Sequence, residues 1–294
     1  MSLSSSFKSF NEISRIALPL QSRLGDHFHY FAHLHQNKEP EMLAKHTAMV
    51  AKYALKLINI HHLDLIVNRL IESLINSDAV QAKHAAGNFI KTLFWDAILF
   101  HDYGKVNETF QANRMQNSVF RRNPGNCIGS KHSGLSALIY IGDHFDRIHQ
   151  EKQFNQWEKN LLGVWTLIFA NVILKHHAPY LEHEINILIE LVDSLHPYLK
   201  KFQIQSEPHL LKAALNNFQN ESHFLSLMDT VFWNIPCFVP HALLRLCFSL
   251  LTAADYYATS SYTLDLQFED FGTLTPEQKI QFQEQFRTSK YYNK

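Results

Sequence analysis

The hexapeptide FHDYGK at residues 100–105 constrains this chain more than any other feature. It sets an imidazole (His101), a carboxylate (Asp102) and an ammonium group (Lys105) beside Gly104. Neighbouring side chains on a helix diverge by about 100°, so His101 and Asp102 face one metal ion only where a helix ends. The segment before them has an amphipathic pattern, and glycine is favoured just past a helix C-terminus. We therefore predict a doublet at an exposed helix end, with a capped end lacking metal as the alternative for a lone pair.

Further nitrogen and oxygen ligands recur at or within predicted helices, and they are His46, His132, His176, His177 and Asp255. The side chains of His176 and His177 would also diverge on a helix, so they face one metal ion only at a helix end. Pro179, two residues after His177, is expected to end that helix. Five histidines and two aspartates are enough for two metal ions that share a bridging carboxylate. Such a pair clamps a phosphoryl group during attack by water. Imidazole mixed with carboxylate suits manganese, iron, nickel, cobalt or zinc better than calcium.

The chain order of these residues resembles that of the ligands in the HD superfamily of metal-dependent phosphohydrolases. The order is His46, His101-Asp102, His132, His176-His177 and Asp255. More closely, the chain resembles the stand-alone HD nuclease of type I CRISPR-associated interference systems. The resemblance spans residues 29–260. It rests on YFAH at 30–33, MLAKHTAMVA at 42–51, HDYGK at 101–105 with Phe110-Gln111 after it, HSGLSAL at 132–138, and the HH and AD pairs at 176–177 and 254–255.

The resemblance implies an HD-domain helical bundle with a metal site at helix ends, and it implies a role for each matching residue. The ligands of the first metal would be His46, His101, Asp102 and Asp255, and those of the second His132, His176 and His177. Asp102 would bridge the two metals. Lys105 would meet the scissile phosphate and stabilise the negative charge of the transition state. The sequence departs from the family at Tyr256, where a small hydroxyl residue is common, and at Ser133, where an acidic residue is common.

The resemblance also implies hydrolysis of single-stranded DNA, by endonuclease and 3′–5′ exonuclease action, in CRISPR antiviral defence. The expected cofactors are two divalent ions of manganese, iron, nickel or cobalt, with magnesium or zinc as alternatives. The chain has no G-x-x-x-x-G-K-[ST] phosphate loop, so unwinding requires a separate ATP-dependent helicase, recruited to a CRISPR RNA-guided surveillance complex. Two alternatives stay open: a phosphohydrolase of dNTPs or cyclic nucleotides with a closed pocket, and a non-catalytic HD scaffold.

Charge favours nucleic acid only locally. The chain has 27 Lys plus Arg and 27 Asp plus Glu, so it has no global basic field. Residues 105–132 form a basic segment, with five Lys and Arg residues against one acid, Glu108, and they include a turn cluster at 123–126 that predicts a loop. The candidate substrate contacts in this segment are Arg114, Arg121, Arg122 and Lys131. Such a loop could follow DNA phosphates while Phe110 or Phe120 stacks on bases, but an ordinary solvated loop is the equal alternative.

Composition predicts an all-α protein, because the chain has 46% hydrophobic residues, only nine glycines and nine prolines, and long periodic segments. We expect an HD nuclease domain at 1–260, and a C-terminal loop with a short helix at 261–294 that begins at the capping box of Thr275. The best strand signal lies at 262–266. Helices are predicted at 40–58, 64–77, 88–103, 132–147, 158–177, 183–195, 207–218 and 238–258.

The sequence predicts a cytoplasmic protein with no membrane partner. The apolar run at 161–174 is shorter than the ~20 residues that a spanning helix needs, and the N-terminus lacks the pattern of a signal peptide. Reduced thiols account for the three cysteines, which share no ligand spacing: Cys127, Cys237 and Cys247.

The chain has 19 histidines, and the proposed site uses five. Four others form a cluster near the N-terminus: His27, His29, His33 and His35. We assign no metal to this cluster, because packing with satisfied hydrogen bonds is the simpler role. His33 falls in a stretch that carries the resemblance, so it is expected to border the site.

Overall fold

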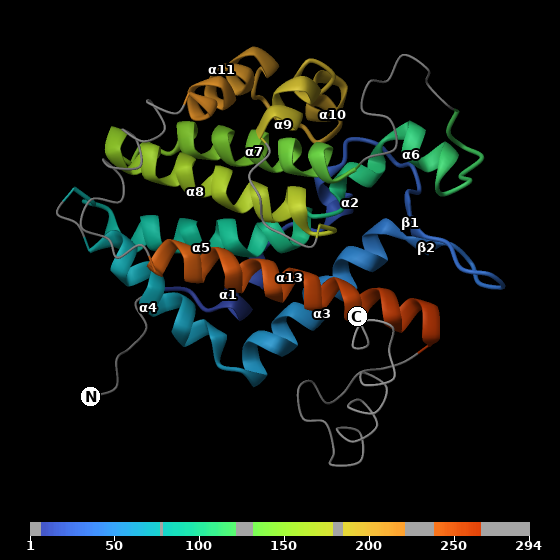
Figure 1. The fold of residues 1–294 in the computed structure, drawn as a ribbon, viewed down its shortest axis with the longest axis horizontal. Helices are drawn as coiled ribbons and strands as arrows, with labels where there is room; N and C mark the ends of the chain where they lie inside the picture. Colours follow the sequence, from blue (N-terminus) through green and yellow to red (C-terminus); the bar gives the residue numbers. More distant parts are fainter. Residues whose placement is uncertain (1–6, 77–78, 122–131, 179–184, 221–237, 266–294) are drawn as a thin grey trace, which may run out of the picture.

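The computed structural model describes residues 7–76, 79–121, 132–178, 185–220 and 238–265 (Figure 1). Within these ranges the chain is all-α, as its composition predicts, apart from one short antiparallel hairpin of β1 (Phe31–His33) and β2 (Glu41–Met42). The helices are α1 (Phe10–Ile16), α2 (Leu20–Arg23), α3 (Leu43–Ile60), α4 (Leu63–Ile75), α5 (Lys83–Phe100), the 3-10 helix η1 (Tyr103–Val106), α6 (Glu108–Asn113), α7 (Ser133–Gln150), α8 (Gln156–Lys175), α9 (Ile185–Val192), α10 (His196–Lys201), α11 (Pro208–Gln219) and α13 (Phe238–Leu264).

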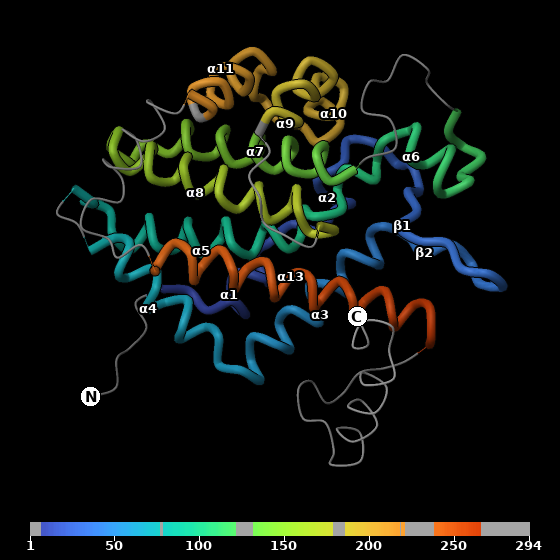
Figure 2. Tube along the Cα trace, in the orientation of Figure 1, coloured from blue at the N-terminus to red at the C-terminus, as the bar shows by residue number. Residues whose placement is uncertain are grey.

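Helices α5 and α8 lie at the centre of the bundle, because both are apolar on nearly every side. Phe94 of α5 meets Phe169 of α8 edge to face, with ring centroids 5.7 Å apart. Trp95 and Trp165 are fully buried beside them. Figures 1 and 2 show α7 beside α8, the short helices α9 to α11 beyond α7, and α3, α4 and α13 on the opposite side of α5.

One buried carboxylate ties the beginnings of α5 and α8 together. Glu158 accepts hydrogen bonds from the backbone N–H of Asn155, the N-cap of α8, at 2.8 Å and from that of Ala82, the residue before α5, at 2.6 Å. The helices have 18 and 20 residues, which corresponds to lengths of about 27 and about 30 Å. Two helices of nearly equal length that start together and run side by side also finish together, to the right in Figure 1.

The hairpin is fixed to the same end of the bundle. His33 pairs with Glu41 across the two strands, and α3 begins directly after β2. The buried amide of Gln111 donates to the carbonyls of Phe31 at 2.8 Å and Lys105 at 2.7 Å, and it accepts from Phe31 N–H at 2.9 Å. Gln111 thus joins β1 to the turn that follows α5.

The strand prediction at 262–266 is wrong as far as the described residues reach. Helix α13 continues to Leu264, so the helical part also extends past the predicted domain boundary at residue 260. Within this last turn, Thr263 Oγ1 donates to the carbonyl of Thr259 at 2.9 Å, and the hydroxyl of Tyr262 donates to the carbonyl of Glu39 at 2.9 Å. The bond between Tyr262 and Glu39 is a tertiary contact, and tertiary contacts override the strand propensity of threonine and tyrosine side chains. The helix predicted to begin at Thr275 lies outside the described residues.

Helix α13 is long and apolar enough for a membrane span by length and composition, with a mean hydropathy of 1.2 and a third of its apolar window buried. It is the one helix in the described ranges that meets this test. Core helices meet it too, and α13 packs against α3, α4, α5 and α8. The apolar run at 161–174 lies inside the buried helix α8.

Candidate metal centre

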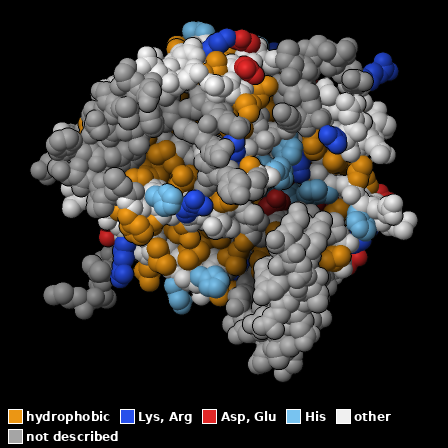
Figure 3. Space-filling view, in the orientation of Figure 1, with side chains coloured by type: hydrophobic (Ala, Val, Ile, Leu, Met, Phe, Trp, Pro, Cys, Tyr) orange, Lys and Arg blue, Asp and Glu red, His pale blue; other side chains and the backbone are white. Residues whose placement is uncertain are grey.

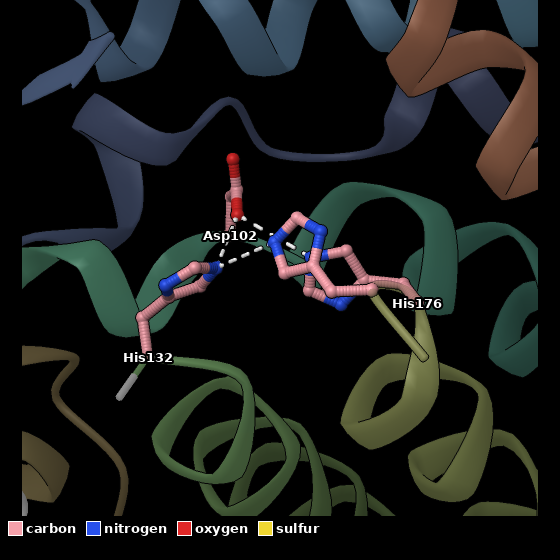
Figure 4. Close-up of side chains that lie close together, drawn as sticks. Asp102, His132 and His176 are labelled. Atoms are coloured by element: carbon pink, nitrogen blue, oxygen red, sulfur yellow. Dashed lines mark hydrogen bonds and ion pairs between the residues drawn. The ribbon is translucent and has the colours of Figure 1, made fainter. Parts of the chain in front are cut away.

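The seven predicted ligands meet at the end of the bundle where α5 and α8 finish. Two of them follow α5, two follow α8, one lies in the first turn of α3, one precedes α7 and one comes from α13. In Figure 4 the carboxylate of Asp102 and the rings of His132 and His176 point toward one another. Figure 3 shows histidines gathered beside acidic and basic side chains on this face of the molecule.

The predicted exposure of the first doublet is wrong. His101 and Asp102 are 0% and 1% exposed, and α5 ends at Phe100, before both of them. Gly104 does not cap α5 with a left-handed conformation. It lies inside η1, where an added Cβ would stand 2.1 Å from the carbonyl oxygen of His132. The absent side chain lets the turn that carries Asp102 touch the start of α7.

The first ligand set surrounds one oxygen of Asp102. His46 Nε2 lies 3.3 Å from Asp102 Oδ2 and 3.1 Å from Asp255 Oδ1. His101 Nε2 lies 3.4 Å from the same Asp102 oxygen and 3.8 Å from Asp255 Oδ1. Two imidazoles and two carboxylates therefore converge on one point.

The second ligand set faces the other oxygen of Asp102. His132 Nε2 lies 3.1 Å and His176 Nε2 3.7 Å from Asp102 Oδ1, and the Nε2 atoms of His132 and His177 are 3.2 Å apart. Atoms that ligate one ion at about 2.1 Å stand about 3–3.5 Å from one another. The distances within the two sets, 3.1–3.8 Å, are close to this spacing. Asp102 presents one oxygen to each set, as a bridging ligand does.

His101 and His176 are oriented in the same way, each by a hydrogen bond to a backbone carbonyl at the end of its helix. His101 Nδ1–H donates to the carbonyl of Ile98 at 2.8 Å, and His176 Nδ1–H donates to that of Ile173 at 2.6 Å. This leaves each Nε2 free of a proton in the neutral ring and turned toward Asp102. Both Nε2 atoms are buried and have no hydrogen-bond partner among the described residues. Buried polar atoms are rarely left this way, so the observation fits metal ligands held by outer hydrogen bonds.

The two ligand sets differ in their electrostatics. Burial disfavours the charged form of His46 and His101, but the carboxylates of Asp102 and Asp255 outweigh it and raise the pKa of His46 to about 10 and that of His101 to about 9. In the second set, burial lowers the pKa of His132 to about 4 and that of His177 to about 3. The first set therefore holds protons at neutral pH, whereas these two imidazoles of the second set are neutral.

Lys105 is held inside the protein. Its side chain is almost fully buried, and Nζ donates to Asp102 Oδ2 at 2.7 Å, to the carbonyl of Ala32 at 3.2 Å and to His33 Nε2 at 3.3 Å. These three acceptors use every N–H of the ammonium group. Although burial alone would raise the pKa of Asp102, Lys105 and His101 keep it well below its usual range. Contact between Lys105 and a phosphate requires the release of one of these acceptors.

The structure adds two residues that carry no assigned role from the sequence, Glu41 and Gln111, and it places His33 at the border of the site, as expected. Glu41 and Gln111 are buried polar side chains: Glu41 lies beside His46, and Gln111 donates to the carbonyl of Lys105. His33 accepts a hydrogen bond from Lys105. His33 and Gln111 fall in stretches that carry the family resemblance, which is the one sequence signal that points to them. Glu41 has no such signal, because its importance depends on the pairing of β1 with β2.

The predicted substrate contacts are only partly described. Arg114 and Arg121 are exposed, while Arg122 and Lys131 lie outside the described residues. The prediction that Phe110 stacks on bases is wrong, because its side chain is only 6% exposed. Its ring packs edge-on against His132, with ring centroids 5.2 Å apart. Phe120 is half-buried and stacks on Tyr30 at 5.2 Å.

A second His-Asp group outside the site has a different character. Asp96, Asp143 and His144 lie close enough to hold a cation. However, Arg147 reaches Asp96 at 3.0 Å and Arg23 reaches Asp143 at 3.2 Å. Two guanidinium groups already balance two carboxylates there, so this group is a buried ion-pair network and no metal is assigned to it.

Searches of protein-family models, curated proteins and solved structures find no match for this chain. The chemistry of the site is therefore argued from its own donors. Those donors are imidazole nitrogens and carboxylate oxygens in two adjoining sets. Such a mixture suits manganese, iron, cobalt, nickel or zinc.

Proposed function

We propose that this chain is a metal-dependent HD-type phosphodiesterase, a nuclease that hydrolyses single-stranded DNA. The observation that carries the proposal is the position of Asp102, whose two oxygens face two different ligand sets. A carboxylate shared in this way suits a pair of cations about 3.5–4 Å apart, the separation that clamps a phosphoryl group during in-line attack by water. The resemblance of the sequence to CRISPR-associated HD nucleases supplies the choice of DNA.

Each ligand set has its own part in the proposal. Two divalent ions of manganese, iron, nickel or cobalt, or else magnesium or zinc, would acidify water and neutralise phosphate charge. His46, His101 and Asp255 would hold one ion with Asp102, which we call the inner ion because its ligands His46 and His101 are fully buried. His132, His176 and His177 would hold the other, outer ion. His177 is exposed whereas His46 and His101 are fully buried, so the substrate reaches the centre from the second set.

Lys105 has two roles in this proposal. Its ammonium keeps the bridging carboxylate ionised, which is the form that binds metal. It also stabilises the charge of the phosphoryl transition state once it gives up one internal acceptor. The bonds to His33 Nε2 and the Ala32 carbonyl, at 3.3 and 3.2 Å, are longer than the one to Asp102 at 2.7 Å, so one of these two is expected to break.

The proposed partners follow from the resemblance and the local charge. Glu108 is the one acid in the basic segment 105–132, and Lys201 already pairs with it at 2.9 Å. Exposed Arg114 and Arg121 then meet the phosphates of the strand. We propose that a separate ATP-dependent helicase and a CRISPR RNA-guided surveillance complex deliver that strand in the cytoplasm. A pull-down from cells that express the system should recover both, and recovery of neither would contradict this partnership.

The decisive experiment is cleavage by metal-stripped protein. Circular and linear single-stranded DNA are incubated with wild type, Asp102→Ala and Asp193→Ala, with manganese, cobalt, nickel, magnesium or zinc restored one at a time. Asp193 is an exposed residue paired with Lys212, so Asp193→Ala is the matched control. We expect cutting of both substrates by wild type and the control, and none by Asp102→Ala. Intact DNA beside hydrolysed dNTPs or cyclic nucleotides would overturn the choice of substrate.

A further inference from the structure

Glu41 is a buried carboxylate shared by two imidazoles at the edge of the first ligand set. It lies in β2 and is 4% exposed. Its Oε2 atom stands 2.8 Å from His33 Nδ1 and 3.3 Å from His46 Nδ1. A carboxylate oxygen accepts hydrogen bonds, and Glu41 Oε2 accepts one from His33 Nδ1–H. His46 Nδ1 is buried and makes no hydrogen bond of full geometry among the described residues, and the oxygen of Glu41, at 3.3 Å, lies within reach of its N–H.

His46 needs an acceptor of this kind because of its place in the fold. His101 and His176 follow the last residues of α5 and α8, where backbone carbonyls are free to accept a side-chain N–H. His46 lies in the first turn of α3, where the carbonyls serve the helix itself. Glu41, on the strand directly before α3, takes the place of the carbonyl. With Nδ1 facing Glu41, Nε2 of His46 faces Asp102 and Asp255.

The same oxygen acts on Lys105 through His33. Because His33 donates from Nδ1 to Glu41, its Nε2 is the acceptor for Lys105 Nζ at 3.3 Å. Lys105 in turn holds the bridging oxygen of Asp102 at 2.7 Å. Glu41 thus acts on the first ligand set in two ways. It contacts the ligand His46 directly, and through His33 it contacts Lys105, which pairs with the bridging carboxylate of Asp102.

A third cation held by His33, Glu41 and His46 does not fit this arrangement, although their donor atoms lie close together. The ammonium of Lys105 already occupies the free nitrogen of His33.

We propose that Glu41 is a positioning residue of the first metal set, which fixes the Nδ1–H form of His46 for metal binding and, through His33, the position of Lys105. This inference rests on the proposed metal-dependent function. Loss of an outer carboxylate that orients a ligating histidine weakens metal binding by about 10–100-fold. The effect should fall on the first set alone, since Glu41 contacts neither His132 nor His177 in the described structure.

Calorimetric titration of the metal-stripped protein with Mn²⁺ tests the proposal. Wild type is compared with Glu41→Gln, which keeps the size of the side chain, and with Glu39→Gln, an exposed glutamate on the same hairpin. We expect two ions in wild type and in Glu39→Gln, and one unchanged ion plus one bound about 10–100-fold more weakly in Glu41→Gln. Two ions bound by Glu41→Gln with wild-type affinity would overturn the role of Glu41 alone. A wild-type protein that binds no Mn²⁺ would overturn the metal centre, and with it this role.

A measurement on wild type alone covers the case in which Glu41→Gln fails to fold. In ¹H–¹⁵N correlation spectra of the Zn²⁺-loaded protein, His46 should show a slowly exchanging proton on Nδ1, with Nε2 shifted by the metal. A packing role for Glu41 would not create this signature. A proton on Nε2, or metal on Nδ1, would overturn the proposal.

Discussion

Gly104 is the residue on which the approach of the two ligand sets depends. Its backbone N–H donates to Ser136 Oγ at 2.8 Å, and its α-carbon faces the carbonyl of His132 without room for a methyl group. We predict that Gly104→Ala destabilises the protein by about 1–3 kcal/mol, because a rigid backbone atom blocks the added Cβ. It should also weaken binding of the second metal, since η1 must move away from α7. Urea unfolding and Mn²⁺ titration measure the two effects.

Gly163→Ala is the matched control for Gly104→Ala. Gly163 lies in α8, and nothing stands within 4 Å of an added Cβ. The alanine should therefore raise stability by roughly 0.5–1 kcal/mol, the ordinary helix preference for alanine over glycine. Equal effects of the two substitutions would contradict the contact of Gly104 with α7.

Also at the residue scale, the protonation of His46 and His101 determines how metal binding should depend on pH. His46 and His101 have pKa values raised to about 10 and about 9, and a ligating imidazole must be neutral. Metal binding therefore expels protons, and the affinity of the first set should rise up to about 100-fold per pH unit between pH 7 and 9. In the metal-free protein the sign is reversed: the raised pKa values stabilise the fold below about pH 6.5, and this stability is lost as pH rises toward 10.

Calorimetry in buffers of different ionisation enthalpy counts the released protons. His177→Ala should leave the count unchanged, because the pKa of His177 is lowered to about 3 and the ring is already neutral. A proton count near zero for wild type at pH 7 would contradict the charge assigned to the first set.

At the scale of elements, Glu158 aligns the two central helices at the end opposite the site. We predict that Glu158→Gln destabilises the protein by about 1–3 kcal/mol, because two backbone N–H groups lose a buried charged acceptor. Two-metal stoichiometry should be retained, since the ligands lie at the other end of α5 and α8. Glu151→Gln, where the carboxylate meets only the surface residue Gln153 in the described structure, should change stability by under about 0.5 kcal/mol. Equal losses in the two variants would contradict the role of Glu158.

The long helices of this chain were predictable, because α3 and α7 repeat their apolar positions over several turns, and α5 and α8 are apolar segments too long for a strand. Helices of four to seven residues, such as α2 and α10, offer too few positions for a periodic signal. The hairpin escaped prediction for the same reason, since its strands have three and two residues.

The ligands could be proposed from sequence because imidazoles and carboxylates at helix ends are few and chemically distinct. The burial of these ligands could not be predicted from sequence, because a local pattern gives no information on what packs over a helix end. Gln111 and Phe31 are 80 residues apart, so their hydrogen bonds appear only once the chain is folded. Glu41 is found in the same way, through its contact with His46 across the start of α3.

At the scale of the whole molecule, the candidate metal centre joins segments that lie far apart in the sequence. The ligands come from α3, the ends of α5 and α8, the start of α7, and α13, so binding two ions would hold the helices of the bundle to one another. A ligand at 100 times its dissociation constant stabilises the folded state by about 2.7 kcal/mol. For a protein of this size, each kcal/mol raises the melting temperature by roughly 2–4 °C. Mn²⁺ should therefore raise it by roughly 5–10 °C, and a chelator should reverse the shift.

Two substitutions assign this shift to the two ligand sets. Asp102→Ala removes an oxygen from both and should abolish most of the Mn²⁺-dependent stabilisation. His177→Ala removes an exposed ligand from the second set alone, so the inner ion should still stabilise the protein, with a smaller shift. Thermal unfolding followed by circular dichroism at several Mn²⁺ concentrations distinguishes these outcomes. A wild-type melting temperature that does not respond to metal would favour the non-catalytic scaffold, because a scaffold needs no ions to hold its helix ends together.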